Sequence, residues 1–182
     1  MEKQKILYVH GFNSSGSTGR FMKDFFGDYE VFAPVIPEKF DEAKSFVEKF
    51  ADDNKIDLVI GTSLGAFITL NLSNDVKKIV INPTFDPYND LQPINASEEV
   101  YESYKGHSFY DEEIYKLTKF KFDNTFGMFG EKDPLFSYGD SFKSLFRDNQ
   151  TFEIPNMEHQ IKPNEIEKYL KPLVDYMMVF NF

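Results

Sequence analysis

Residues 58–65 read Leu-Val-Ile-Gly-Thr-Ser-Leu-Gly, and this stretch decides the predicted fold. Asp57–Ile60 is a short apolar run of the kind found in a strand that is buried on both faces. Residues 64–72 follow directly and are rich in good helix formers. Gly61–Gly65 joins the two and carries the pattern Gly-x-Ser-x-Gly. The stretch therefore predicts a strand, a tight turn with a serine at its centre, and a helix.

The predicted turn makes Ser63 a candidate nucleophile. The pattern alone is weak, because three positions that each match at a frequency of about 0.07 give roughly a 0.06 chance of an accidental match over about 180 windows. A strand before it and a helix after it are the setting that the motif requires. Gly61 and Gly65 are expected to let neighbouring backbone approach a strained serine closely. The non-catalytic alternative is an ordinary strand-to-helix loop in which Ser63 caps the helix.

A serine hydroxyl needs a general base, and the chain offers three histidines. His159 lies just after the apolar run Thr151–Ile154, in a loop that can reach back over the edge of a sheet. His10 ends the first apolar run and is expected to shape a loop near the serine rather than act as base. His107 is expected to pack at the surface or in a cap. We therefore predict His159 as the base, with an exposed loop histidine as the alternative.

The base needs an acid to orient it, and Asp133 is the best-placed candidate. It follows the run Thr125–Phe129, so Ser63, Asp133 and His159 each come just after a predicted strand. The carboxyl ends of parallel strands lie at one edge of a sheet, where such residues can meet. Asp86 follows another predicted strand and stays open as an alternative. Two further acids compete less well, namely Asp140 in a predicted helix and Glu153 within a predicted strand.

An oxyanion hole needs two backbone N–H groups. Leu64, which follows the serine, is expected to supply one, and Phe12 in the segment His10-Gly11-Phe12-Asn13 the other. The Ser/Gly-rich loop Asn13–Gly19 can also be read as a phosphate cradle. It lacks the Gly-Lys-Ser/Thr ending of a nucleotide-binding loop, which disfavours that alternative.

The whole chain alternates short apolar runs with amphipathic segments, which predicts a parallel sheet covered by helices on both faces. We expect one domain over residues 1–182, with the strand order 2-1-3-4-5-6 and a cap-like insertion at about residues 84–122, helical around Asp111–Phe120. Asp41 is expected to cap a helix that extends to Asp53. In the last helix, Pro163 suits the first turn and Pro172 predicts a kink or a split. The six expected strands are Lys5–His10, Tyr29–Ala33, Asp57–Ile60, Lys78–Ile81, Thr125–Phe129 and Thr151–Ile154.

Composition excludes several classes of function. The chain has no cysteine, so disulfide frameworks and thiolate sites are absent, and no metal or cofactor is expected. A net charge of −10 disfavours nucleic acid as a partner. No apolar segment approaches the roughly 20 residues of a membrane span, and the first residues do not resemble a signal peptide. We therefore expect a cytoplasmic protein; its oligomeric state is not predicted.

Two motifs carry a resemblance to a known family. Residues 6–15, Ile-Leu-Tyr-Val-His-Gly-Phe-Asn-Ser-Ser, together with Gly61–Gly65, resemble the YqiA/YcfP-like esterases of the α/β-hydrolase superfamily. The resemblance covers nearly the whole chain. It implies a Ser63-Asp133-His159 triad that hydrolyses carboxylic esters or thioesters. Thr62 and Ala66 depart from the expected serine and glycine.

The expected function is serine hydrolysis of a small-molecule ester or thioester through an acyl-enzyme on Ser63. One alternative keeps the scaffold without the chemistry, as a binding protein, and predicts that His159 lies too far from Ser63 to share a proton. Another keeps the triad but takes a peptide or an acyl-CoA. The acidic surface disfavours the CoA group unless lysines gather in the cap, where Lys105, Lys116, Lys119 and Lys121 are the candidates.

Overall fold

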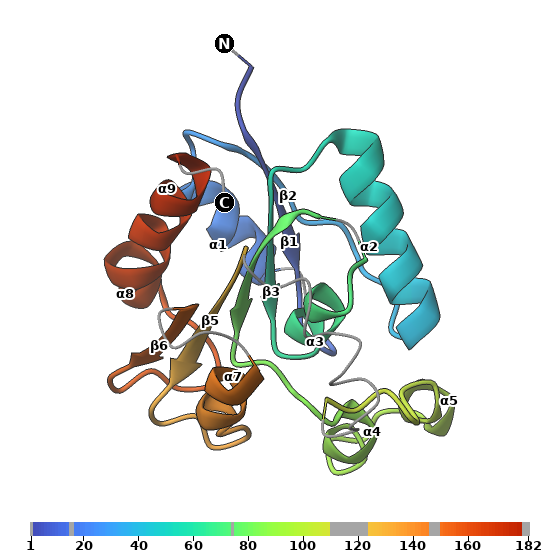
Figure 1. Cartoon of the computed structure of the whole chain (residues 1–182). Coiled ribbons are helices and arrows are strands. Elements are labelled where there is room, and N and C mark those ends of the chain that lie inside the picture. Colours follow the sequence, from blue (N-terminus) through green and yellow to red (C-terminus); the bar gives the residue numbers. More distant parts are fainter. Residues whose placement is uncertain (1, 15–16, 74, 110–123, 146–149, 180–182) are drawn as a thin grey trace.

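The computed structural model describes residues 2–14, 17–73, 75–109, 124–145 and 150–179. Its centre is a six-stranded parallel sheet in the order β2-β1-β3-β4-β5-β6 (Figure 1), which confirms the predicted order. All strands run in one direction, so the loops that follow them meet at one edge. The strands are β1 Lys5–Val9, β2 Glu30–Phe32, β3 Leu58–Thr62, β4 Lys77–Ile81, β5 Thr125–Gly130 and β6 Thr151–Ile154.

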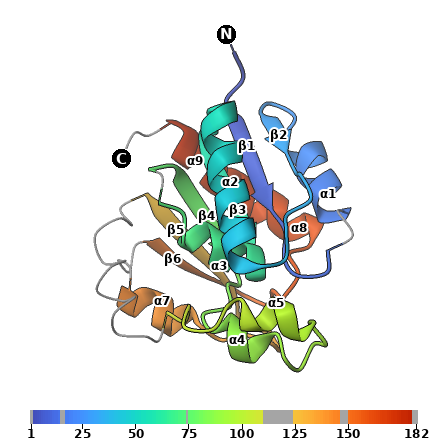
Figure 2. The ribbon, with the colours of Figure 1, turned by 90° about the vertical axis from the view of Figure 1, so that its right-hand side faces the viewer.

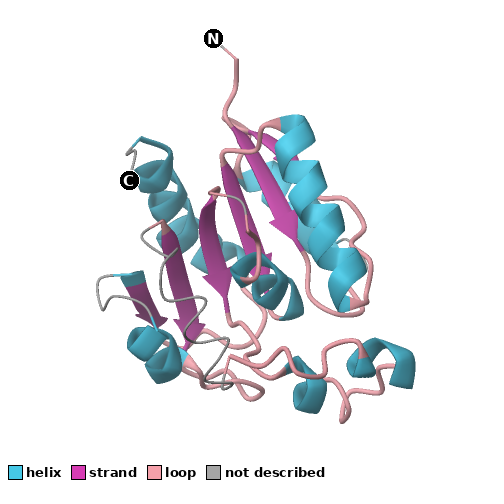
Figure 3. Cartoon of the chain, turned by 45° about the vertical axis from the view of Figure 1, so that its right-hand side comes forward, coloured by secondary structure: helices cyan, strands magenta, loops and turns pink. Residues whose placement is uncertain are grey.

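Both faces of the sheet are covered by helices, as predicted (Figures 2 and 3). Alternate residues of β1 belong to two different apolar clusters, because successive side chains of a strand point to opposite faces. Leu7 packs on the face covered by α2 (Phe40–Asn54) and α3 (Leu64–Leu70). Ile6 packs on the face covered by α1 (Ser17–Phe25) and α9 (Lys171–Val179). The buried residues of each helix in these clusters determine which of its sides faces the sheet.

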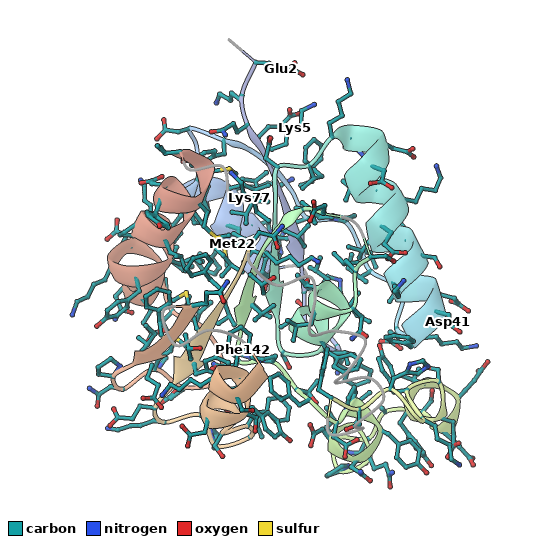
Figure 4. All side chains as sticks on the ribbon, in the orientation of Figure 1. Glu2, Lys5, Met22, Asp41, Lys77 and Phe142 are labelled. Carbon is teal, nitrogen blue, oxygen red and sulfur yellow. The ribbon has the colours of Figure 1, made fainter. Side chains whose placement is uncertain are left out.

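The start of α2 corrects one prediction. The N-cap is Lys39, without a side-chain capping bond, and Asp41 lies inside the first turn (Figure 4). The helix begins earlier because Phe40 is only 4% exposed and its backbone N–H donates to Ser103 Oγ. Packing of this ring therefore overrides the capping preference of the aspartate, whose carboxylate still lies near the positive end of the helix.

The last helix is split where Pro172 predicts it. Pro163 begins a short helix α8 (Pro163–Glu165), a π-helix spans Ile166–Leu170, and α9 continues from Lys171. The Lys171 N–H donates to the Ile166 carbonyl, a bond one residue longer than in an α-helix. This wider turn directly precedes a residue that has no N–H to donate, so the irregular geometry falls where the proline requires it.

Two short helices, α4 (Pro87–Asp90) and α5 (Glu98–Glu102), lie beyond the carboxyl edge of the sheet (Figure 1). They belong to the insertion predicted at residues 84–122, and the helix expected at Asp111–Phe120 lies outside the described residues. A third helix, α7 (Gly139–Leu145), packs on β5 through Phe142, which contacts the ring of Phe129 (Figure 4). Within the described ranges, no helix combines the length and the apolarity needed to cross a membrane.

Candidate active site

Ser63 sits in the turn between β3 and α3, in a backbone conformation that few residues other than glycine adopt. Its φ is +55° and its ψ is −120°. The surrounding bonds hold this conformation: the Ser63 N–H donates to the Ile81 carbonyl, and the Ser63 carbonyl accepts from Ala66 and Phe67. Strain of this kind persists only where the surroundings enforce it, and it is concentrated at functional sites.

Close approach of backbone makes the glycines beside Ser63 obligatory, as predicted. A Cβ on Gly65 would lie 2.2 Å from the Val9 carbonyl oxygen and 2.4 Å from that of His10. A Cβ on Gly61 would lie 2.4 Å from Thr69 Oγ1. Neither space can hold a side chain, so α3 packs directly on the ends of β1 and β3.

The loop after β1 touches the serine through a third glycine. A Cβ on Gly11 would lie 3.0 Å from Ser63 Cβ and 3.5 Å from its Oγ. His10 holds this loop: Nε2 accepts the Ile36 N–H at 3.1 Å, so Nδ1 carries the proton and donates to the Gly11 carbonyl at 2.8 Å. The peptide is planar and trans, so fixing the Gly11 carbonyl also fixes the direction of the Phe12 N–H.

The two predicted oxyanion donors are the N–H groups of Leu64 and Phe12. Leu64 follows Ser63 in the sequence, and Phe12 follows Gly11 in the loop that contacts Ser63. Within the described ranges neither N–H donates to a protein acceptor. Leu64 is the first residue of α3, where the helix leaves its N–H groups without intrahelical partners. Both N–H groups are thus available to donate to an oxyanion. That they form an oxyanion hole stays a prediction.

His159 is hydrogen-bonded to both of the other predicted residues. Its Nε2 lies 3.0 Å from Ser63 Oγ and its Nδ1 lies 2.8 Å from Asp133 Oδ2. The His159 side chain is 17% exposed and the Asp133 side chain 1%. These distances allow Ser63 to pass its proton to Nε2, while the Nδ1–H group donates a hydrogen bond to the Asp133 carboxylate.

The Asp133 carboxylate is held by its own turn. Its second oxygen, Oδ1, accepts the N–H groups of Leu135 at 2.8 Å and Phe136 at 3.1 Å. Both oxygens therefore have partners, which suits an ionised carboxylate in a buried position. The ring of Phe136 also packs edge-on against the imidazole of His159, with centroids 5.0 Å apart.

The competing acids bind elsewhere. Asp86 is the N-cap of α4, and its Oδ2 accepts from Asn89 Nδ2 at 2.6 Å. Asp140 lies in α7 with its side chain 97% exposed, and Glu153 lies in β6 beside Lys143. None of these three acids contacts His159. The geometry therefore favours Asp133 over Asp86, the alternative that the sequence left open.

Asn82 is a residue that the sequence reasoning missed. It directly follows β4, is 2% exposed and has a φ of +44°. Its Nδ2 donates to the carbonyls of Glu158 and His159, both at 2.9 Å, and its Oδ1 accepts the Gly130 N–H at 2.7 Å. One side chain thus ties together the loops that carry the acid and the base. An asparagine at the end of an apolar strand was the available signal.

Three further residues have packing, ionic or hydrogen-bond partners. His107 stacks on Phe40 with centroids 4.0 Å apart, as expected of a packing histidine. Lys105 pairs with Glu102 at 3.3 Å; the other three cap lysines lie outside the described residues. Burial raises the pKa of Asp90 above its usual range, although Thr84 and Tyr138 donate hydrogen bonds to its carboxylate.

Within the described ranges, no three His, Asp or Glu side chains gather closely enough to hold a metal ion. The reactive side chains that the structure brings together are the Ser63 hydroxyl, the His159 imidazole and the Asp133 carboxylate.

Comparison with known proteins gives one family and one fold. The model of the Uncharacterised protein family (UPF0227) matches residues 5–177. A comparison with curated protein sequences found no match.

Several solved structures share the fold at low sequence identity. A predicted CIB-like hydrolase from Thermoplasma acidophilum superposes with a TM-score of 0.68 and 16% identity, covering 97% of this chain and 87% of that one. The fluorophosphonate-binding serine hydrolase FphF of Staphylococcus aureus has a TM-score of 0.69 and 15% identity, over 97% and 84%. A monoacylglycerol lipase from Paleococcus ferrophilus has a TM-score of 0.67 and 13% identity, over 98% and 96%. These likenesses establish the α/β-hydrolase fold.

Proposed function

The chain belongs to the Uncharacterised protein family (UPF0227) and has the α/β-hydrolase fold, and from this premise we propose that it is a serine hydrolase. Its substrates are carboxylic esters or thioesters, and its nucleophile is Ser63. The observation that carries the proposal is the unbroken hydrogen-bonded series from Ser63 Oγ through His159 to Asp133. The similar structures named above include one serine hydrolase and one lipase, in agreement with this chemistry.

The reaction proceeds in two halves. His159 Nε2 takes the proton of Ser63 Oγ as that oxygen attacks the carbonyl carbon, and the carbonyl oxygen becomes an oxyanion that accepts from the Phe12 and Leu64 N–H groups. Asp133 stabilises the resulting imidazolium. The tetrahedral intermediate then collapses: the bond to the leaving oxygen or sulfur breaks, and that atom takes the proton from Nε2. An acyl-enzyme on Ser63 and a free alcohol or thiol remain.

Water completes the cycle. His159 Nε2 takes a proton from a water molecule as its oxygen attacks the acyl carbon, and the same two N–H groups hold the second oxyanion. Collapse breaks the bond to Ser63 Oγ, which recovers its proton from Nε2. The carboxylic acid leaves and the enzyme is restored.

The alternative of a binding protein on the same scaffold requires a histidine too distant from the serine to share its proton. The separation of 3.0 Å between Ser63 Oγ and His159 Nε2 disfavours it. Peptide or acyl-CoA substrates use the same series of groups. With Lys105 already paired with Glu102, the described part of the cap supplies no observation in favour of CoA.

The test is the loss of one hydroxyl. Ser63→Ala is expected to abolish hydrolysis of p-nitrophenyl esters and labelling by a fluorophosphonate probe, because the proposed acyl-enzyme forms on the Ser63 hydroxyl. Ser144→Ala in α7 is the matched control, since the Ser144 hydroxyl is exposed and donates only to its own helix, at the Ser141 carbonyl. Retained ester hydrolysis in Ser63→Ala, or a probe adduct on another residue, would overturn the proposal.

A further inference from the structure

A cavity of about 310 Å³ opens beside the serine turn, between the loop after β1, the loop after β2 and α3. We call it the side pocket. Its volume is at the small end of ligand sites, which run from about 300 to 1,000 Å³. The residues that line it are His10, Gly11, Phe12, Asn13, Ser14, Val35, Ile36, Pro37, Glu38, Leu64, Gly65, Ile68 and Tyr104.

The buried wall of the side pocket is apolar, and the polar side chains of His10 and Tyr104 in it already have partners. Ile36, Leu64 and Ile68 are 6%, 6% and 2% exposed. The Tyr104 hydroxyl donates to the Glu38 carbonyl at 2.8 Å, and both ring nitrogens of His10 are engaged. Among the lining residues, Glu38 carries the one carboxylate, and this residue is exposed. A neutral, apolar group therefore fits this wall, because a charged one would lose its hydration without gaining a partner.

The position of the side pocket decides whether it can bind the acyl chain or the leaving group of an ester. Its lining includes the Gly11 and Phe12 side of the serine but no residue of the loops that carry Asp133 and His159. A leaving group must accept its proton from His159 Nε2, so it has to lie on the histidine side. The other substituent of the carbonyl carbon, the acyl chain, then points away from His159 and toward the side pocket.

We propose that the side pocket binds the acyl chain of the substrate, and that this chain is neutral and of medium length. The inference rests on the proposed function of Ser63. A water-sized group occupies roughly 30 Å³, so the cavity accepts a chain on the order of eight carbons. The leaving group then lies on the His159 side of Ser63, outside the side pocket. The enzyme therefore discriminates among acyl chains more strongly than among leaving groups.

The test uses two substitutions of Ile68, one that makes the side pocket smaller and one that makes it larger. In the unaltered protein, the ratio of kcat/KM for p-nitrophenyl octanoate to that for the acetate exceeds one, because each buried methylene contributes about a fourfold gain. Ile68→Trp fills the cavity and is expected to lower this ratio by about 100-fold. Ile68→Ala lengthens the cavity and is expected to move the optimum to chains longer than octanoate. The second variant decides the matter if the tryptophan variant does not fold.

The matched control is Ile94→Trp, since Ile94 is 44% exposed and does not line the side pocket. It is expected to leave the octanoate-to-acetate ratio within twofold of the unaltered protein, a spread set by ordinary surface substitutions. All variants are compared by the rate at which a small fluorophosphonate labels Ser63, which reports the reactive serine independently of chain length.

The outcomes separate the two claims. If no ester is hydrolysed and Ser63 is not labelled in the unaltered protein, the proposed function fails. If esters are hydrolysed but neither variant of Ile68 changes the chain-length profile, the acyl pocket is overturned. The same holds if Ile68→Trp instead changes the preference between p-nitrophenyl and 4-methylumbelliferyl esters of one acid, because the pocket would then hold the leaving group.

Discussion

The two sides of the catalytic arrangement are built in different ways. The serine turn, Gly61–Gly65, is held by backbone packed against backbone. A Cβ on Gly65 would lie 2.2 Å from the Val9 carbonyl oxygen, so no side chain fits there. The acid–base loops, Gly130–Phe136 and Asn156–His159, are held by side chains. Asn82 bonds to both loops and Asp133 bonds to two N–H groups of its own turn.

The difference teaches what each side can tolerate. Steric exclusion and backbone hydrogen bonds together hold the serine turn, so it is expected to keep its shape as long as its glycines remain. A hydrogen-bonded loop keeps its shape only while every partner is present, since a buried group left without one costs about 1–3 kcal/mol. We therefore expect substitutions on the serine side to act on folding and substitutions on the acid–base side to act on rate.

The largest effect is expected from Asp133→Asn. The amide can still accept from Leu135 and Phe136, but its NH2 group would face His159 Nδ1 and hold the imidazole in the tautomer whose Nε2 cannot take the serine proton. We expect kcat to fall roughly 10³- to 10⁴-fold with little loss of stability. Steady-state kinetics measure it, with Asp140→Asn as the exposed control. A fall of less than tenfold would mean that Asp133 does not orient the base.

The next largest effect concerns folding. Gly65→Ala places a Cβ within 2.4 Å of two carbonyl oxygens of the β1 end, so we expect a loss of about 3 kcal/mol in the free energy of unfolding. Urea denaturation followed by circular dichroism measures it. Gly27→Ala is the control, since a Cβ there has no neighbour within 4 Å. Equal stability of the two variants would show that the backbone beside Ser63 can yield.

A smaller effect is expected from Asn82→Gly, which keeps the φ of +44° accessible while removing the amide. The acid–base loops lose their common partner, and misplacement of His159 by a fraction of an ångström is expected to lower kcat/KM about 10- to 100-fold. Stability should fall by about 2 kcal/mol.

The control for Asn82 is Asn124→Ala. Its amide also donates to a backbone carbonyl, that of Val76 at 3.1 Å, but it lies at the opposite end of the sheet. This variant should lose stability with kcat/KM unchanged. If Asn82→Gly likewise loses stability alone, the two loops position themselves without it.

The smallest effect is expected from Tyr8→Phe. It removes a hydrogen bond of 2.9 Å between the Tyr8 hydroxyl and Thr62 Oγ1, next to the serine. We expect about 1 kcal/mol less stability by thermal denaturation and a kcat/KM within twofold of the unaltered protein. A tenfold loss of kcat/KM would break the comparison, because the serine turn would then depend on a polar contact as well.

The same contrast explains which parts of the molecule are predictable from the sequence. The serine turn is set by residues within five positions of one another, so its glycines and its flanking strand reveal it directly. The sheet order follows from the alternation of strands and helices, because crossovers between parallel strands are right-handed. Buried strands such as Leu58–Thr62 differ from their predicted bounds only at the ends.

The acid–base side depends on contacts between distant segments, which no local pattern encodes. Asp86 and Asp133 both follow strands, and only the three-dimensional path of the loops separates a helix cap from a partner of His159. Asn82 lies 77 positions from His159 in the chain. The start of α2 is hidden for the same reason, since Phe40 is placed by a contact with Ser103.

The apolar cluster on the α9 face of the sheet has a consequence for synthesis on the ribosome. Ile6 and Tyr8 of β1 pack in one cluster with Val174 and Met177, and Gln4 Nε2 donates to the Met178 carbonyl. At about 5–20 residues per second, the nascent chain waits roughly ten to thirty seconds between making β1 and making the helix that covers it. During that interval the side of this cluster that α9 later covers stays open to chaperones and to other nascent chains.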